Sequence, residues 1–153
     1  ILCGLPFAGK TTLAKALVRE LHLSRVSIDD LNTERGIWDD EKGLSSEEWT
    51  NVYNEAYRRL DALLSQGKSV LDDNANFTRE QRDHLRVIAA KYQVPTTVIY
   101  VMTPLTEVRR RWQENRQTKV RNDVRDEDFA LVVDSFEAPT DDEHVVCYDG
   151  VMT

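Results

Sequence analysis

Residues 4–11 read Gly4-Leu5-Pro6-Phe7-Ala8-Gly9-Lys10-Thr11, and this stretch decides the fold of the chain. It fits the pattern G-x-x-x-x-G-K-[ST], in which two glycines, a lysine and a hydroxyl residue stand at fixed spacing. The apolar residues Ile1 to Cys3 precede it, and Leu13, Leu17 and Leu21 follow it at helical spacing. The pattern therefore predicts the end of a buried strand, a glycine-rich turn and a helix, in that order.

This turn carries the chemistry needed to bind phosphate. Its backbone N–H groups gather at a helix N-terminus, whose dipole also favours negative charge. Lys10 is expected to reach the β- and γ-phosphates of ATP, and the Thr11 hydroxyl is expected to bind Mg²⁺. ATP is preferred to GTP because the sequence has no guanine-reading N-K-x-D. The predicted nucleotide site consists of Gly4, Leu5, Pro6, Phe7, Ala8, Gly9, Lys10, Thr11 and Thr12.

Beyond this turn, short apolar runs alternate with helical stretches. Further strands are expected at Arg25 to Ile28, from Ser69 to Leu71, at Thr96 to Met102 and at His144 to Tyr148. Ser45 and Glu48 can form a capping box at the start of a long helix. This alternation predicts an α/β fold with a parallel sheet and helices on both faces. The 153 residues suit one domain that spans 1–153.

Acidic residues follow the second and third expected strands, at the sheet edge where such folds bind ligands. Asp29 is a candidate general base for an attacking hydroxyl, although Asp29 or Asp30 could instead cap the next helix. Asp72 and Asp73 end the third strand, and Asp72 is predicted to hold Mg²⁺ directly or through water. The other interpretation of this pair is a polar strand end that begins a turn.

The net charge of −7 is unevenly distributed. Seven basic and two acidic residues lie between Arg109 and Arg125, whereas the rest of the chain is strongly acidic. A basic segment at about 104–125 could be only a solvated face, but it also suits a lid that closes over a compact anion. Arg111 and Arg116 are the leading candidates to stabilise charge on a migrating phosphoryl group.

Two regions bear on a second ligand. Trp49, Tyr53 and Tyr57 on the long helix are predicted to be packing residues rather than an acceptor platform. The region from Leu31 to Glu48, with Gly36, Trp38 and Gly43, is expected to form part of the acceptor pocket. Its sequence indicates no chemical class of acceptor.

The remaining features indicate a cytoplasmic protein. No apolar run approaches the roughly 20 residues that span a bilayer, so no membrane partner is expected. Cys3 and Cys147 are predicted to be two buried free thiols rather than a disulfide. The three histidines lack the spacing of a zinc site. Because Ile1 already lies in an apolar segment, we expect that a few upstream residues are absent from this sequence.

With these motifs assembled, the chain resembles the kinase-like P-loop proteins related to phage-type polynucleotide 5′-kinases, zeta-toxin kinases and chloramphenicol phosphotransferases. The resemblance rests on GLPFAGKTTLA, SIDDLN, LDDNANFTREQR, the arginine-rich segment and SFEAPTDDE. It implies a three-layer fold with a five-stranded parallel sheet of order 2-3-1-4-5. It also implies that Asp29 is the general base, that Asp72 is the metal-associated acid and that Arg111 and Arg116 clamp the phosphates.

We therefore expect a phosphotransferase that moves the γ-phosphate of Mg-ATP to a hydroxyl of a small-molecule acceptor. One alternative is a polynucleotide or RNA 5′-hydroxyl kinase. The acidic composition does not favour a nucleic-acid partner, and Asn32 stands where polynucleotide kinases have an arginine for the acceptor phosphate. The other alternative is a regulatory ATP-binding module with slow ATPase activity.

Overall fold

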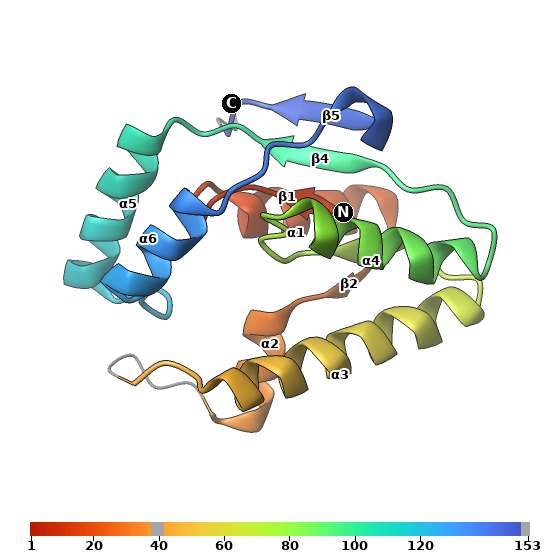
Figure 1. The fold of residues 1–153 in the computed structure, drawn as a ribbon, viewed down its shortest axis with the longest axis horizontal. Coiled ribbons are helices and arrows are strands. Elements are labelled where there is room, and N and C mark those ends of the chain that lie inside the picture. The colour runs from red at the N-terminus through yellow and green to blue at the C-terminus, as the bar shows by residue number, and fades with distance from the viewer. Residues whose placement is uncertain (38–41, 151–153) are drawn as a thin grey trace.

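The structure is a computed structural model that describes residues 1–37 and 42–150. Its elements, in chain order, are β1 (Leu2–Cys3), α1 (Lys10–Leu21), β2 (Ser24–Val26), α2 (Ile28–Arg35), α3 (Ser46–Ser65), β3 (Val70–Asp72), α4 (Arg79–Ala90), β4 (Val98–Val101), α5 (Leu105–Thr118), α6 (Asp126–Asp134), the 3₁₀ helix η1 (Asp141–Glu143) and β5 (Val145–Tyr148). Strands and helices alternate along most of the chain (Figure 1), which confirms the predicted α/β class.

The strands pair in parallel, but they form two ladders: β1-β4-β5 and β2-β3. The two ladders meet just beyond β3, where the Gly4 N–H donates to the Ala75 carbonyl oxygen at 3.1 Å. There the Asn76 Nδ2 donates to the Leu2 carbonyl oxygen at 2.8 Å. The arrangement agrees with the predicted order 2-3-1-4-5, and the five strands are divided between two hydrogen-bonded ladders. A side-chain amide takes the place of a backbone partner at this junction, because Asn76 has left-handed backbone angles with φ 46°.

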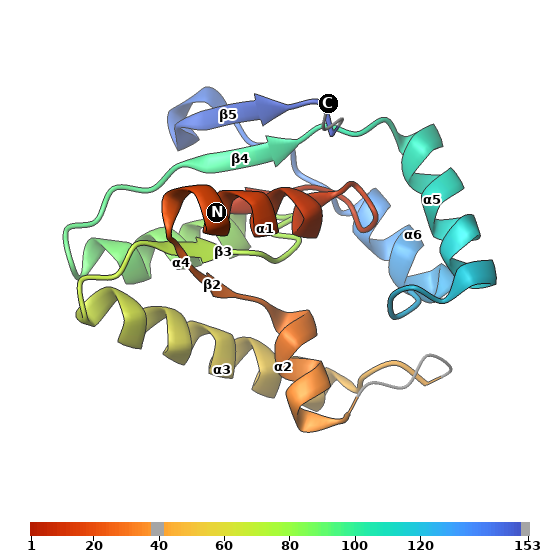
Figure 2. The same cartoon turned by 180° about the vertical axis from the view of Figure 1, so that it is seen from behind.

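Helices cover both faces of these strands, as predicted. In Figure 2 α1 lies in front of the strands, and in Figure 1 α4 lies in front of them on the opposite face. Leu2, Ala14 and Leu71 form the core between α1 and the strands. The residues that join α3 to α4 are Leu60, Leu64, Leu85, Ile88 and Ala89. The functional cleft described below therefore has a rigid, packed base.

Local sequence signals account for the position of α3. The Ser45 Oγ accepts from the Glu48 N–H at 3.2 Å, and a Glu48 carboxylate oxygen accepts from the Ser45 N–H at 2.7 Å. The predicted capping box is confirmed. The start of α2 differs from its prediction, because β2 ends at Val26 and Ser27 is the N-cap. Asp29 and Asp30 therefore lie inside the first turn of α2 rather than capping it.

A buried ion pair holds the junction between the ladders. Arg82 and Glu143 are both 0% exposed, and the Arg82 Nε donates to a Glu143 oxygen at 2.8 Å. The Arg82 Nη1 also donates to the Asn76 carbonyl oxygen at 2.9 Å. Burial opposes ionisation of Glu143, but hydrogen bonds from Arg82, the Thr140 backbone and Arg86 outweigh it and lower the Glu143 pKa to about 2. This ion pair fixes the loop that positions the cleft residues after β3.

Two further sequence predictions can be compared with the described residues. Cys3 and Cys147 are free thiols and Cys3 is buried, as predicted, but Cys147 is exposed, so the prediction that both are buried is wrong for Cys147. Within residues 1–37 and 42–150, no helix is both long and apolar enough to span a bilayer.

Candidate active site

The turn between β1 and α1 has the backbone that its motif predicts. A Cβ atom on Gly4 would lie 2.9 Å from the Val101 carbonyl oxygen, so β4 can approach the turn only if this residue is glycine. Gly9 has φ 102° and caps α1 without a side-chain hydrogen bond. The first-turn residues Lys10, Thr11 and Thr12 line the cleft described below. Their N–H groups are therefore placed to bind an anion.

The Lys10 side chain folds back over this turn. Its Nζ donates to the Gly4 carbonyl oxygen at 2.9 Å and to the Leu5 carbonyl oxygen at 2.7 Å. Burial and the nearby Arg121 lower the Lys10 pKa to about 8, although Asp73 and Asp29 oppose this shift. Phosphate oxygens of a bound nucleotide can replace the carbonyl oxygens as acceptors for the ammonium group.

This pKa predicts a pH dependence for nucleotide binding. Only protonated Lys10 attracts phosphate, and its pKa of about 8 lies below the ordinary lysine value of about 10.4. The bound phosphate restores the ordinary pKa, so ATP affinity should fall about tenfold or more between pH 7 and pH 9.5. Isothermal titration calorimetry can measure this change. The variant Lys10→Arg stays charged and should show little change, whereas a flat wild-type profile would contradict the assignment.

The two aspartates at the end of β3 have different surroundings. Asp72 is buried, and its oxygens accept from the Asn74 and Asn76 side-chain amides at 3.0 and 2.7 Å. Burial raises the Asp72 pKa, and Asp72 does not line the cleft. Asp73 does line it and accepts from the Arg25 Nε at 2.8 Å. Asp73, rather than the predicted metal acid Asp72, therefore lines the cleft beside the phosphate-binding turn, and the metal role of Asp72 stays a prediction.

The first turn of α2 brings Asp29, but not Asp30, to the same cleft. The Asn74 Oδ1 accepts from the Ile28 N–H at 2.8 Å and so fixes this turn to the end of β3. Asp30 instead accepts from the Arg25 Nη1 at 2.7 Å. An Asp29 oxygen lies 3.5 Å from the Arg121 Nη2. Asp29 is thus held where it can meet a ligand at the phosphate end.

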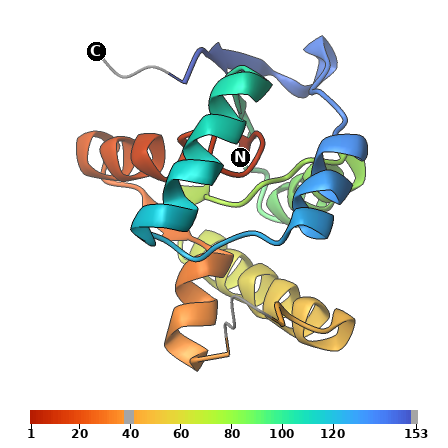
Figure 3. The same ribbon diagram turned by 90° about the vertical axis from the view of Figure 1, so that its left-hand side faces the viewer.

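The predicted lid consists of α5 and the segment 119–125 that follows it. In Figure 3 α5 lies across the glycine-rich turn, with α6 beside it and α2 and α3 below. The Arg111 Nη1 donates to the Phe7 and Ala8 carbonyl oxygens at 3.4 and 3.3 Å. The expectation for Arg111, which reaches the phosphate-binding turn, therefore agrees with its position.

The other predicted lid arginine, Arg116, lies apart from the cleft, whereas Arg121 reaches it. Arg116 does not line the cleft; it pairs with Asp123 and Asp126 and stacks on Trp112, 4.3 Å from the ring centroid. Arg121 does line the cleft, and its guanidinium carbon lies 4.5 Å from the Phe7 ring centroid. Sequence reasoning missed Arg121 because the left-handed Lys119, which ends α5, turns the chain back toward Phe7.

These groups meet in one cleft of about 1000 Å³. Its size is at the upper end of the roughly 300–1,000 Å³ that small-molecule sites occupy, so it can hold two ligands. Trp49 and Tyr53 line it in addition to packing against the core beside α2, which corrects the prediction that they only pack. In the region from Leu31 to Glu48, no described residue lines the cleft. Trp38, expected in the acceptor pocket, lies outside the described residues.

A glycine-rich phosphate-binding turn, acids just beyond β2 and β3, and arginines from α5 and the segment after it are the arrangement of P-loop kinase folds. A family model described as "AAA domain" matches residues 1–139, and the chain belongs to this family. A search of the curated proteins found no significant match.

Solved structures with similar folds include several kinases. The APS kinase CysC of Mycobacterium tuberculosis, in complex with AMPPNP and APS, is 18% identical to this chain and has a TM-score of 0.65. The match covers 97% of this chain and 86% of the CysC chain. Kti12 of Chaetomium thermophilum, in complex with ADP-AlF3, is 22% identical with a TM-score of 0.69 over 97% and 88%. A gluconokinase from Sinorhizobium meliloti is 15% identical with a TM-score of 0.66 over 99% and 82%. At these identities the likeness shows the fold.

Proposed function

We propose that this protein is an ATP-dependent kinase that transfers the γ-phosphoryl group of Mg-ATP to a hydroxyl of a small molecule. The observation that supports this most is the convergence of Lys10, Asp29, Asp73, Arg111 and Arg121 on one cleft of about 1000 Å³. A nucleotide and an acceptor can both fit there. Among proteins of similar fold, the gluconokinase and a sugar kinase are named for small-molecule acceptors, which agrees with this reading.

Each group has a role in the transfer step. The N–H groups of the turn and Lys10 bind the triphosphate, and Asp29 accepts the proton of the acceptor hydroxyl as its oxygen attacks the γ-phosphorus. The bond from the γ-phosphorus to the bridging oxygen breaks, and ADP leaves with that electron pair. Arg111 and Arg121 stabilise the charge on the transferred group. Arg121 must then exchange its contact with Asp29 for a phosphate oxygen.

The cleft also suits Mg²⁺, which would neutralise charge on the β- and γ-phosphates. Thr11 and Asp73 both line the cleft, and kinase sites hold Mg²⁺ with one or two side chains plus phosphate oxygens and water. Burial raises the Asp73 pKa, although the Arg25 hydrogen bond opposes this shift. A cation would favour the ionised carboxylate. We therefore assign the metal-binding role to Thr11 and Asp73, since Asn74 and Asn76 occupy the oxygens of Asp72.

We also propose that the protein acts in the cytoplasm and that residues 1–153 form a single domain. Cys3 and Cys147 are free thiols, as in most proteins of a reducing compartment. Residues 104–125 would act as the lid of that domain, since α5 and Arg121 already contact the phosphate-binding turn.

Replacing Asp29 by asparagine tests the proposed base. Because asparagine cannot accept the proton, transfer should fall about 10²–10⁴-fold while ATP affinity stays close to the wild-type value. Steady-state transfer of labelled γ-phosphate and calorimetric ATP titration measure the two quantities. Asp30→Asn is the matched control, since Asp30 lies next to Asp29 in α2 but binds Arg25 outside the cleft lining. Wild-type transfer by Asp29→Asn would remove Asp29 from the mechanism.

A further inference from the structure

The half of the cleft that lies away from α1 and the lid has a chemical character of its own. It is formed by α2, α3, the segment 73–81 and α6, and we call it the acceptor half. Its aromatic lining residues are Trp49, Tyr53 and Phe77, and its acidic ones are Asp29, Asp73 and Asp128. None of the lining residues that these four parts contribute, among those described, is a lysine or an arginine.

The aromatic side chains offer an apolar surface to a ligand. The Trp49 and Tyr53 rings lie one turn apart on α3, with centroids 6.2 Å apart and planes tilted by 40°. Phe77 lies on the segment after β3 and belongs to none of the core clusters formed by the described residues. Binding is favoured when an apolar part of a ligand covers a partly exposed phenylalanine ring in a cleft, because apolar surface is removed from water. The acceptor half is thus suited to a ring.

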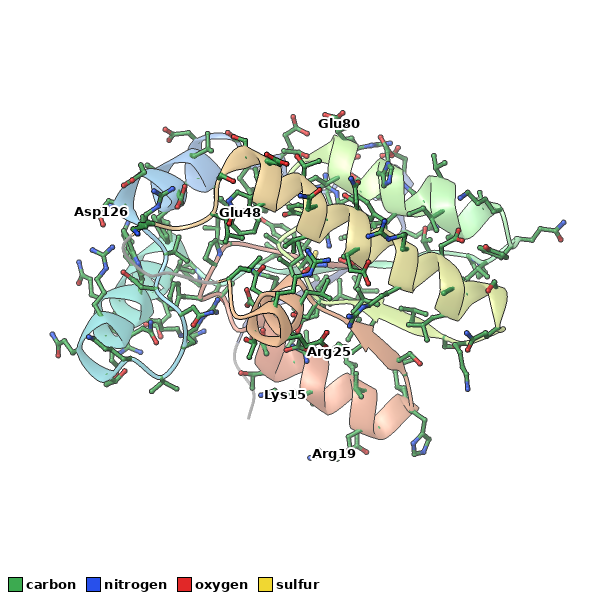
Figure 4. All side chains as sticks on the ribbon, turned by 90° about the horizontal axis from the view of Figure 1, so that it is seen from below. Lys15, Arg19, Arg25, Glu48, Glu80 and Asp126 are labelled. Atoms are coloured by element: carbon green, nitrogen blue, oxygen red, sulfur yellow. The ribbon has the colours of Figure 1, made fainter. Side chains whose placement is uncertain are left out.

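The cations that line the cleft come from α1, α5 and the segment after α5, although Arg121 also reaches Asp29 in the acceptor half. The lining cations are Lys10 and Lys15 on α1, Arg111 on α5 and Arg121 after α5. Figure 4 shows that Lys15 projects from α1 on the side away from α3. The triphosphate would engage the cations at the turn and the lid, so little positive charge remains for a second anion.

Three arginines adjoin the acceptor half, and each is paired with a carboxylate. The Arg121 Nη2 lies 3.5 Å from an Asp29 oxygen. Arg25 donates to Asp73 at 2.8 Å and to Asp30 at 2.7 Å. Arg125 donates to both oxygens of Asp128 at 2.7 and 3.1 Å. A phosphate or carboxylate on the acceptor would have to compete with these ion pairs, since recognition of such groups relies on arginine or lysine.

We infer that the acceptor is an uncharged or cationic alcohol that carries an apolar ring, and that phosphorylated or carboxylated alcohols and nucleic acids are excluded. The inference rests on the proposed kinase function and specifies its substrate class. The ring packs against Phe77 and Tyr53, the hydroxyl reaches Asp29, and an amine, where present, faces the acidic side chains. The hydroxyl proton passes to Asp29 as the new oxygen–phosphorus bond forms.

Matched alcohols test this class by binding, without requiring transfer. Phenylalaninol is cationic, 3-phenylpropane-1,2-diol is neutral and 3-phenyllactate is anionic, and all three share a ring and a hydroxyl; alaninol lacks the ring. Each is titrated against the protein saturated with Mg²⁺ and a non-hydrolysable ATP analogue. Phenylalaninol and the diol should bind about tenfold or more tightly than phenyllactate, and phenylalaninol about tenfold more tightly than alaninol.

Variants on and off the aromatic surface show where the ring binds. Phe77→Ala and Tyr53→Leu should remove most of the preference for phenylalaninol over alaninol. Tyr57→Leu is the control, because Tyr57 lies one turn beyond Tyr53 and packs on His84 at 4.2 Å outside the cleft lining. Urea unfolding shows whether each variant is folded, and binding of the ATP analogue shows whether the nucleotide end is intact.

The outcomes separate the acceptor class from the kinase proposal. Three results would each overturn the acceptor class: equal or tighter binding of phenyllactate, no binding of any ring alcohol, or an unchanged ring preference in both Phe77→Ala and Tyr53→Leu. Transfer of γ-phosphate to another acceptor would still leave the kinase proposal standing. Selective binding of phenylalaninol and the diol supports the class. Should neither these bound alcohols nor any other acceptor of the panel in the Discussion receive labelled phosphate, the kinase proposal is the part that fails.

Discussion

Replacing Lys10 by alanine is expected to reduce phosphoryl transfer about 10²–10³-fold, the usual cost of losing one group that stabilises developing charge. The Lys10 ammonium lies over the phosphate-binding turn, 2.9 and 2.7 Å from the Gly4 and Leu5 carbonyl oxygens. Alanine leaves the triphosphate without this charge, and the remaining N–H groups of α1 cannot supply it. ATP affinity should fall as well, because the ammonium also contacts the bound ground state.

The control for this variant is Lys68→Ala. Lys68 is an exposed lysine between α3 and β3 that does not line the cleft. Both variants should unfold in urea close to the wild-type midpoint, because Lys10 contributes only two hydrogen bonds to carbonyl oxygens. Transfer by Lys10→Ala within threefold of wild type would show that the P-loop lysine has no part in the reaction.

The largest effect on stability is expected for Glu143→Gln. Glu143 and Arg82 are both 0% exposed, so the substitution leaves the Arg82 guanidinium buried without a neutralising carboxylate. Removal of one member of such a pair costs about 3–5 kcal/mol. For a domain of this size the midpoint of thermal unfolding should fall by about 6–20 °C. Equilibrium urea unfolding gives the change in free energy directly.

The pH dependence of this effect identifies its cause. Because the Glu143 pKa is about 2, below the ordinary value of about 4.3, ionised Glu143 stabilises the wild type above pH 4.3. That contribution is lost as pH falls toward 2, where the two proteins should differ less. Asp142→Asn removes a neighbouring carboxylate that is 62% exposed and paired with Arg79, and it should cost far less stability than Glu143→Gln because exposed ion pairs contribute little. Equal losses for the two variants would contradict the buried-pair explanation.

Short-range patterns in the sequence predicted much of the fold. The motif records both glycines of the phosphate-binding turn. Gly9 is needed for a local reason, its positive φ at the start of α1, and the capping box of Ser45 and Glu48 is equally local. Gly4 is needed because Val101 on β4 approaches it closely, so the motif records one contact between distant parts of the chain as well.

The features that the sequence did not predict depend on side-chain direction and on contacts between distant elements. Which of Asp72 and Asp73 faces the cleft depends on the register of a three-residue strand. The choice between Arg116 and Arg121 depends on how Lys119 turns the chain. The split of the sheet depends on Asn76, whose amide bonds to Leu2, 74 residues away in sequence. No pattern of hydrophobicity or charge encodes these three arrangements.

Transfer of labelled γ-phosphate from ATP to a panel of alcohols tests the kinase proposal most directly. The panel should include phenylalaninol, 3-phenylpropane-1,2-diol, nucleosides, sugars and 5′-hydroxyl oligonucleotides, with the Lys10→Ala variant as the blank. We expect a labelled phosphoester on an uncharged or cationic ring alcohol that disappears with Lys10→Ala. Release of free phosphate alone across the whole panel would contradict a kinase and would favour a regulatory module with slow ATPase activity.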